Sequence, residues 1–207
     1  MKSKRKADGR KHPLLFYRHT MGRLWRISIM ADIVLWATWW FLGPGLSLFM
    51  SDFIWYGAVV ILVIAIFARL ARNMGYVQAK ADHLLLATAF LRLKISYRRI
   101  VSARPQEFVQ LFSPKRMSWA DRRFTEPYFG KTILAVILNG YPLSPVILKL
   151  FLSKLFFHPK ERAGFILVTP DWMALSTEID SYKSSWREKN ASKHQNLGMR
   201  GLYGEDE

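Results

Sequence analysis

The sequence contains no cysteine, and this absence removes several kinds of site at once. Disulfides, thiolate zinc sites, iron–sulfur clusters and a cysteine nucleophile are all excluded. Acidic residues are also scarce, because 15 Asp and Glu stand against 31 Lys and Arg in 207 residues, giving a formal net charge of +16. A chain this basic is attracted to nucleic acid or to the anionic cytoplasmic leaflet of a membrane, so its location has to decide between these partners.

Motifs for catalysis and for cofactor binding are missing as well. The five histidines are scattered, without an HExxH motif, and the glycines form neither a P-loop nor a dinucleotide-binding fingerprint. Ser144 and Ser153 have no nucleophile-elbow motif around them. We therefore predict a protein that is not an enzyme, with no catalytic residue, no cofactor and no metal site.

Two long apolar runs follow one another near the start of the chain. Between residues 27 and 68 only Asp32 and Asp52 are charged. A helix needs about 20 residues to cross the roughly 30 Å of hydrocarbon in a bilayer. We therefore predict two transmembrane helices, over residues 24–42 and 53–71.

The connection between the two runs is short and contains the helix breaker Gly43-Pro44-Gly45, which predicts a tight antiparallel hairpin. Nine Lys and Arg lie in residues 1–26, others follow the second run, and the connection has none. The positive-inside rule places both termini in the cytoplasm. A basic leader beside such a hairpin favours contact with anionic lipid of the inner leaflet over contact with nucleic acid.

Asp32 is the one charge well inside the first predicted span. A carboxylate facing lipid costs about 2.5–3.5 kcal/mol at a helix centre and less near the interface. One interpretation is an interfacial carboxylate that snorkels or pairs with a neighbouring Arg, since Arg26 lies one to two turns before it. The other is a buried polar contact with a partner helix.

After Asn73 the apolar runs become short and are separated by Gly, Pro and charged residues, which is typical of β-structure. Six strands are predicted, over residues 76–80, 83–88, 90–96, 100–104, 132–138 and 165–169. A helix should follow, with Thr169 as N-cap, Pro170 at its first position and Asp171 in its first turn. Its apolar face consists of Trp172, Leu175, Ile179, Tyr182 and Trp186.

Two stretches of the chain resemble the bacterial pleckstrin-homology-like (bacterial PH domain) membrane protein family. They are GYVQAKADHLLLATAFLRLKISYRRIVSARP and GFILVTPDWMALSTEIDSY. The spacing pattern is carried by Tyr76, Leu84, Ile95, Tyr97 and Ile100, with Ser96 where proline is common. The resemblance implies successive antiparallel strands in a bent barrel with a C-terminal capping helix. It also implies a bacterial inner (plasma) membrane protein, because many members follow two transmembrane helices.

The predicted fold class is thus a membrane α-helical hairpin of two transmembrane helices plus an α+β, mainly-β PH-like barrel with a C-terminal capping helix. The domain organisation follows from these segments. We predict a basic cytoplasmic leader over 1–23, the hairpin over 24–72, the PH-like domain over 73–187 and a flexible tail over 188–207.

Two excursions interrupt the barrel pattern, over residues 105–131 and 140–164. Residues 146–157 are nearly all apolar and form either a barrel strand with an extension or a helix in the membrane interface. Basic residues interleaved with aromatic ones favour headgroup contact, while a protein interface and ordinary core with solvated loops stay open. The candidate lipid or partner contacts are Arg92, Lys94, Arg98, Arg99, Lys115, Arg116, Arg122, Arg123, Lys149 and Lys154, with Asp32 as a candidate intramembrane polar contact.

These features predict a non-enzymatic, membrane-anchored scaffold, assembly or accessory factor that works through protein or membrane-surface contacts. An anionic-lipid surface sensor is one alternative, and an accessory subunit of a larger bioenergetic or transport membrane complex is another. The expected partners are anionic inner-leaflet lipids and a membrane protein or a second copy of the chain. The phosphoinositide specificity of eukaryotic pleckstrin-homology domains does not follow from a fold resemblance.

Overall fold

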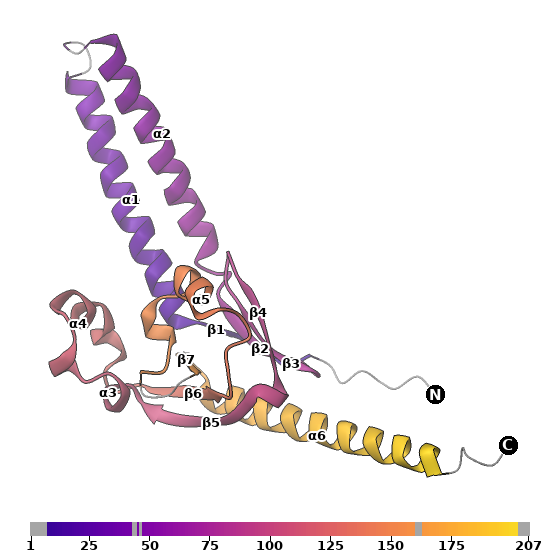
Figure 1. Ribbon diagram of the computed structural model, residues 1–207. Coiled ribbons are helices and arrows are strands. Elements are labelled where there is room, and N and C mark those ends of the chain that lie inside the picture. The colour runs from indigo at the N-terminus through magenta and orange to yellow at the C-terminus, as the bar shows by residue number, and fades with distance from the viewer. Residues whose placement is uncertain (1–7, 43–44, 46, 160–162, 203–207) are drawn as a thin grey trace. The chain divides into compact units, whose positions relative to one another are not determined.

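The computed structural model describes residues 8–42, 45, 47–159 and 163–202. The protein is of mixed α/β type with two antiparallel sheets. It divides into two compact units, a helical unit of residues 13–76 and a sheet unit of residues 1–12 and 77–207 (Figure 1). The helical unit is thus inserted, along the chain, into the sheet unit.

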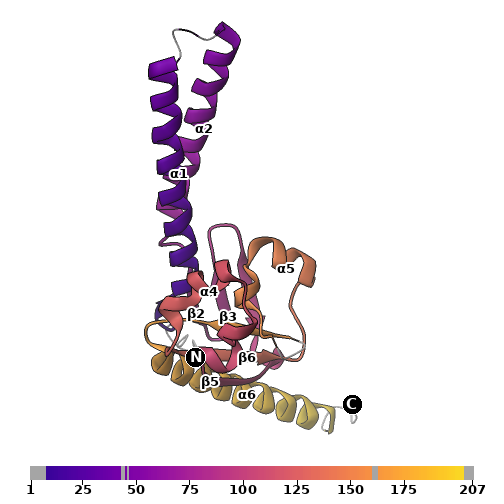
Figure 2. The same cartoon turned by 90° about the vertical axis from the view of Figure 1, so that its left-hand side faces the viewer.

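The helical unit is a pair of long helices, α1 (Leu15–Leu42) and α2 (Leu48–Ala71), which lie side by side along their lengths (Figure 2). Two neighbouring helices joined by a short connection are confirmed, although α1 begins at Leu15, within the segment 1–23 expected to be the leader, and α2 begins at Leu48. The first two residues of its expected breaker, Gly43 and Pro44, lie outside the described residues. Four alanines of α2 are buried: Ala58, Ala65, Ala68 and Ala71. Such small residues allow two helix backbones to approach closely.

Of the helices in the described part of the chain, α2 alone is long and apolar enough to cross a membrane, over Phe49–Ala71. The first predicted span, in α1, stays a prediction. Both helices nevertheless expose large apolar side chains, among them Met30, Ile33, Trp40, Phe41, Phe53, Val60, Val63 and Leu70. Apolar surface of this extent marks an interaction with lipid or protein rather than with water.

The two ends of the helical unit are held together at their base. The backbone N–H of Leu14 donates to the carbonyl oxygen of Gly75, with 3.1 Å between the atoms. The Tyr17 ring packs so closely on Gly75 that a Cβ atom there would overlap it. Glycine is therefore required at this position for steric reasons.

Within the described residues seven strands form the two sheets, and in each sheet every strand pairs with its neighbour in the chain. The first sheet contains β1 (Lys11–Pro13), β2 (Tyr76–Ala79), β3 (His83–Ala87) and β4 (Arg92–Ser96), and the second contains β5 (Ile100–Glu107), β6 (Thr132–Leu138) and β7 (Gly164–Leu167). All six predicted strands are confirmed, with ends that differ by a few residues. Strand β4 buries Leu93 and Ile95 and exposes Arg92 and Lys94.

Strand β1 was not predicted, since its residues lie within the expected leader over 1–23. The strand is extended at its N-terminal side, where the backbone N–H of Gly9 donates to the carbonyl oxygen of Ala79 at 2.8 Å. The Gln78 side chain donates back to the carbonyl oxygen of Gly9 at 2.7 Å. Three residues are too few to show the alternation by which a strand is recognised in a sequence.

Helix α6 (Trp172–Leu202) follows β7 and contacts β5 and β6. Its predicted apolar face is confirmed, because Leu175 and Ile179 are fully buried. The predicted N-cap was wrong: Asp171, and not Thr169, caps the helix, since its Oδ1 accepts from the backbone N–H of Ala174 at 3.1 Å. The helix also runs well into the segment 188–207 that we expected to be a flexible tail.

The two excursions from the barrel pattern are mainly helical. The first contains the α-helices α3 (Phe108–Leu111) and α4 (Trp119–Thr125) and the 3-10 helices η3 (Pro114–Arg116) and η4 (Glu126–Tyr128). The second contains the α-helix α5 (Pro145–Phe151) and the 3-10 helix η5 (Lys154–Phe156). Of the two interpretations of residues 146–157, the barrel strand is therefore wrong. The segment forms two short helical pieces.

Candidate functional site

Helix α5 lies at the surface of the sheet unit and exposes apolar side chains. Pro145 occupies its first turn, where the missing N–H and the fixed φ angle suit a helix start. Leu148 is completely buried and Leu152 nearly so, and these two leucines anchor the segment. Val146 and Leu150, by contrast, are 76% and 78% exposed. The helix is therefore held by one side and presents large aliphatic side chains on the other.

A residue from the β3–β4 turn extends this apolar surface. The rings of Phe90 and Phe151 lie with their centroids 6.5 Å apart, although the two residues are distant in the sequence. The exposed apolar side chains of this region are Phe90, Leu143, Val146, Ile147, Leu150 and Phe151, and we call them the α5 ridge. An exposed apolar cluster of this kind marks an interaction site.

Basic residues accompany the α5 ridge. Lys149 is exposed within α5 itself, and Arg92 is exposed at the start of β4, two residues after Phe90. Apolar side chains beside cations are typical of segments that lie in the interface of an anionic membrane. The predicted contacts Arg92 and Lys149 thus belong to segments that carry the ridge.

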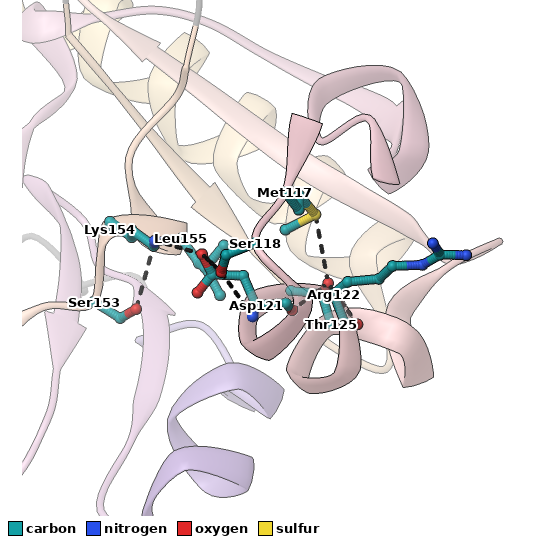
Figure 3. A network of polar contacts seen from close by, with 8 residues as sticks. All are labelled: Met117, Ser118, Asp121, Arg122, Thr125, Ser153, Lys154 and Leu155. Carbon is teal, nitrogen blue, oxygen red and sulfur yellow. Dashed lines mark hydrogen bonds and ion pairs between the residues drawn. The ribbon is translucent and has the colours of Figure 1, made fainter. Parts of the chain in front are cut away.

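A second group of polar side chains links α4 to η5 (Figure 3). Ser118 caps α4, accepting from the backbone N–H of Asp121 at 3.2 Å and donating its hydroxyl to Asp121 Oδ2 at 2.8 Å. Lys154 Nζ donates to the same carboxylate oxygen at 2.5 Å. The hydrogen bond from Lys154, followed by that from Ser118, lowers the pKa of the Asp121 carboxyl below its ordinary value.

The α4–η5 link borders a cavity of about 310 Å³. Its apolar lining consists of Phe112, Met117, Leu155, Phe157 and Pro159, and its polar lining consists of Ser118, Asp121, Lys149, Lys154 and His158. The volume is at the lower end of the range for small-molecule sites. The Lys154 side chain is already paired with Asp121, so Lys149 is the one lysine among the described lining residues that forms no ion pair with a described carboxylate.

The remaining predicted contacts are spread over several elements. Arg98 and Arg99 lie in η2 (Tyr97–Arg99), and Arg99 has a structural role because its guanidinium donates to the carbonyl oxygen of Tyr141 at 2.8 Å. Arg122 is exposed on α4, and Arg123 lies over the exposed Trp119 ring, 5.4 Å from its centroid. Lys94 and Lys115 are exposed as well, whereas the side chain of Arg116 lies outside the described residues. The structure therefore brings together Lys149 and Lys154 but not the whole predicted set.

Two residues of these sites, Asp121 and Phe90, were absent from the sequence prediction. Asp121 could have been found, since Ser118 followed three residues later by an acidic residue is a helix-capping pattern. Phe90 could not, because its contact with Phe151 depends on how the β3–β4 turn meets α5.

Asp32 lies in the helical unit and is 7% exposed, and Ser28, one helical turn earlier, is buried too. Within the described residues no hydrogen-bond partner contacts Asp32 Oδ1, and no Lys, Arg or His forms an ion pair with this residue. The side chains of Asp32 and Ser28 are thus both enclosed in the protein.

No three His, Asp or Glu side chains converge as metal ligands in the ranges that the structure covers. Comparison with known proteins finds no match for this chain among protein-family models, curated proteins or solved structures.

Proposed function

We propose that this chain is a non-enzymatic, membrane-anchored accessory protein whose sheet unit binds the surface of the membrane that holds the hairpin. The observation that carries the proposal is the α5 ridge, a cluster of exposed apolar side chains on segments that also expose Arg92 and Lys149. The ridge belongs to a chain that also contains a helix able to span a bilayer.

Chain connectivity supports the proposal. Helix α2 ends at Ala71 and β2 begins at Tyr76, so residues 72–75 form the whole connection. Even fully extended, this link reaches no more than about 17 Å. A tether of this length keeps the concentration of the ridge near the bilayer high, so that a weak surface contact suffices.

The energies involved are adequate for such a contact. Moving an exposed Val or Leu side chain out of water contributes about 1.5–3 kcal/mol, and a Lys or Arg near an anionic surface contributes about 1 kcal/mol. Val146 and Leu150 together with Lys149 and Arg92 therefore supply several kcal/mol, before the entropy of ordering the sheet unit is subtracted.

The proposal includes two spans, cytoplasmic termini and a bacterial PH-like domain in the inner membrane. The first span is supported by the exposed apolar side chains of α1, and the orientation by the basic residues before α1 and after α2. The PH-like assignment is supported by the antiparallel strands that follow one another in each sheet and by α6 after the last of them, because the sequence resemblance implies successive antiparallel strands and a C-terminal helix.

A site-specific fluorophore tests the surface contact, because the chain has no cysteine of its own. Full-length Val146→Cys protein, labelled with bimane in nanodiscs of anionic lipid, should be quenched by brominated acyl chains. Label at Met173→Cys, a residue of α6 that is 63% exposed, is the matched control and should be quenched much less.

The surface contact should weaken in zwitterionic nanodiscs and with added salt, because exposed charges are screened over a Debye length of about 10 Å at 0.1 M salt. Equal quenching at the two positions, or none at either, would contradict the proposal and assign the α5 ridge to a protein partner instead.

A further inference from the structure

The buried carboxyl of Asp32 lies on the side of α1 that packs against α2. Asp32 and Ser28 are one helical turn apart and therefore share a face of α1. The buried side chains of these two residues, and those of Ala58 and Ala65 on α2, mark the seam between the two helices. Asp32 and Ala58 are equally far along the chain from the ends of the connection, Leu42 and Leu48, so they lie at about the same level in the hairpin.

An ionised carboxylate in this position needs a partner that the described part of the hairpin does not provide. The Oδ1 atom of Asp32 is inaccessible to solvent and has no hydrogen-bond partner there. Burying a charge without a counter-charge or hydrogen bonds is strongly unfavourable. For this reason an ionisable residue within a membrane usually marks a functional contact.

A groove of about 560 Å³ runs beside the seam. It is lined by Ile27, Met30, Ala31, Val34 and Leu35 of α1 and by Ile61 of α2. At 3.6 residues per turn, Leu35 lies about 60° and Ala31 about 100° around the helix axis from Asp32. The groove therefore borders the seam next to Asp32, and its lining is apolar throughout.

We infer that this groove binds a transmembrane helix of another protein that carries a Lys or Arg at the depth of Asp32. Charge complementarity decides the occupant. Between residues 27 and 68 this chain has no Lys or Arg, so a second copy would bring only another carboxylate. An apolar helix with one long basic side chain fits the groove and supplies the missing donor to the seam. The inference rests on the proposed insertion of both helices.

Defined peptides test the inference with the full-length protein in liposomes. A donor fluorophore at Ser47→Cys, in the connection, reports energy transfer from acceptor-labelled polyleucine transmembrane peptides with a central Lys, Leu or Glu. The Lys peptide should associate about 10-fold more tightly than the Leu peptide, since interhelical polar contacts contribute 1–2 kcal/mol in model peptides and 1.4 kcal/mol is tenfold. The Glu peptide should gain nothing.

Asp32→Asn should abolish the preference for the Lys peptide, while Asp52→Asn, which removes an exposed carboxylate at the start of α2, should retain it. Equal association of the Lys and Leu peptides, or a preference that survives Asp32→Asn, would overturn the inference. Transfer between differently labelled copies that exceeds transfer to the Lys peptide would assign the groove to a second copy and overturn it too.

Insertion is measured separately, by brominated-lipid quenching of a bimane label at Ile33→Cys, an exposed position of α1. Quenching there with equal peptide association rejects the pairing alone. Absence of quenching at Ile33→Cys rejects the proposed insertion and, with it, the pairing.

Discussion

Two leucines of α5 allow a matched experiment, because the same substitution is expected to act on different properties. Leu148 is 0% exposed, whereas Leu150, two residues later on the same short helix, is 78% exposed. Leu148→Ala should destabilise the fold, and Leu150→Ala should leave it intact but weaken contact with the membrane.

The magnitudes follow from burial. Truncation of a fully buried leucine to alanine costs about 2–5 kcal/mol, so Leu148→Ala should lower the free energy of unfolding by about 3 kcal/mol. For a domain of this size that corresponds to a melting temperature lower by roughly 6–12 °C. Leu150→Ala should change stability by less than about 0.5 kcal/mol, as exposed substitutions do.

On contact with the membrane, Leu150→Ala should have the larger effect of the two substitutions. If Leu150 enters the acyl region, its truncation removes about 2 kcal/mol of transfer free energy. The ratio of docked to undocked sheet unit then falls roughly 30-fold, since 1.4 kcal/mol is tenfold. Stability is measured by thermal unfolding in mild detergent, and docking by brominated-lipid quenching of bimane at Val146→Cys in nanodiscs.

Either of two results would contradict these expectations. If Leu150→Ala lowers the melting temperature as much as Leu148→Ala does, the assignment of buried and exposed sides of α5 is wrong. If Leu150→Ala leaves quenching unchanged in a bilayer where the Val146→Cys label is quenched, α5 lies near lipid without the ridge supplying the binding energy.

Two further predictions concern α4 and the base of the hairpin. The pKa of Asp121 is lowered by Lys154 and Ser118, so the carboxylate stabilises the fold above its unfolded pKa, and this contribution is lost as pH falls through the lowered folded pKa. The difference in free energy of unfolding between wild type and Asp121→Asn should therefore shrink as pH falls from about 5 to 2 in an acid-unfolding series. A difference that stays constant over this range would reject a role for the Asp121 charge. Gly75→Ala should lower the temperature at which the helical circular dichroism signal is lost on heating, because the new Cβ overlaps the Tyr17 ring. In a Tyr17→Ala background the same substitution should have no such effect.

Much of the architecture could be predicted because it depends on local patterns. The apolar runs predicted two helices and a connection, and the alternation of apolar and polar residues in RLKIS matches the buried and exposed sides of β4. The apolar face of α6 followed from residues three and four apart. The failures have local causes too: β1 is too short for a pattern, and both Thr169 and Asp171 are good N-caps, so the sequence could not choose between them.

The site depended on contacts between distant residues. Lys149 and Lys154 were identified as candidates, but the sequence could not tell that Asp121 of another segment engages one of them and leaves the other. Arg99 looked like a surface contact and is used to hold the carbonyl oxygen of Tyr141. Side-chain pairs of this kind form between residues that are adjacent only after folding.

By itself, the amino-acid sequence determined the basic charge, the absence of cysteine chemistry, the apolar hairpin helices and most of the strands, because composition and periodicity are properties of neighbouring residues. The tertiary structure alone decided which apolar side chains stay exposed, because α5 buries Leu148 and presents Leu150 according to what packs beneath it. It also decided that Asp32 is enclosed in the helical unit, since burial of a side chain depends on the surfaces that surround it and not on its place in the chain.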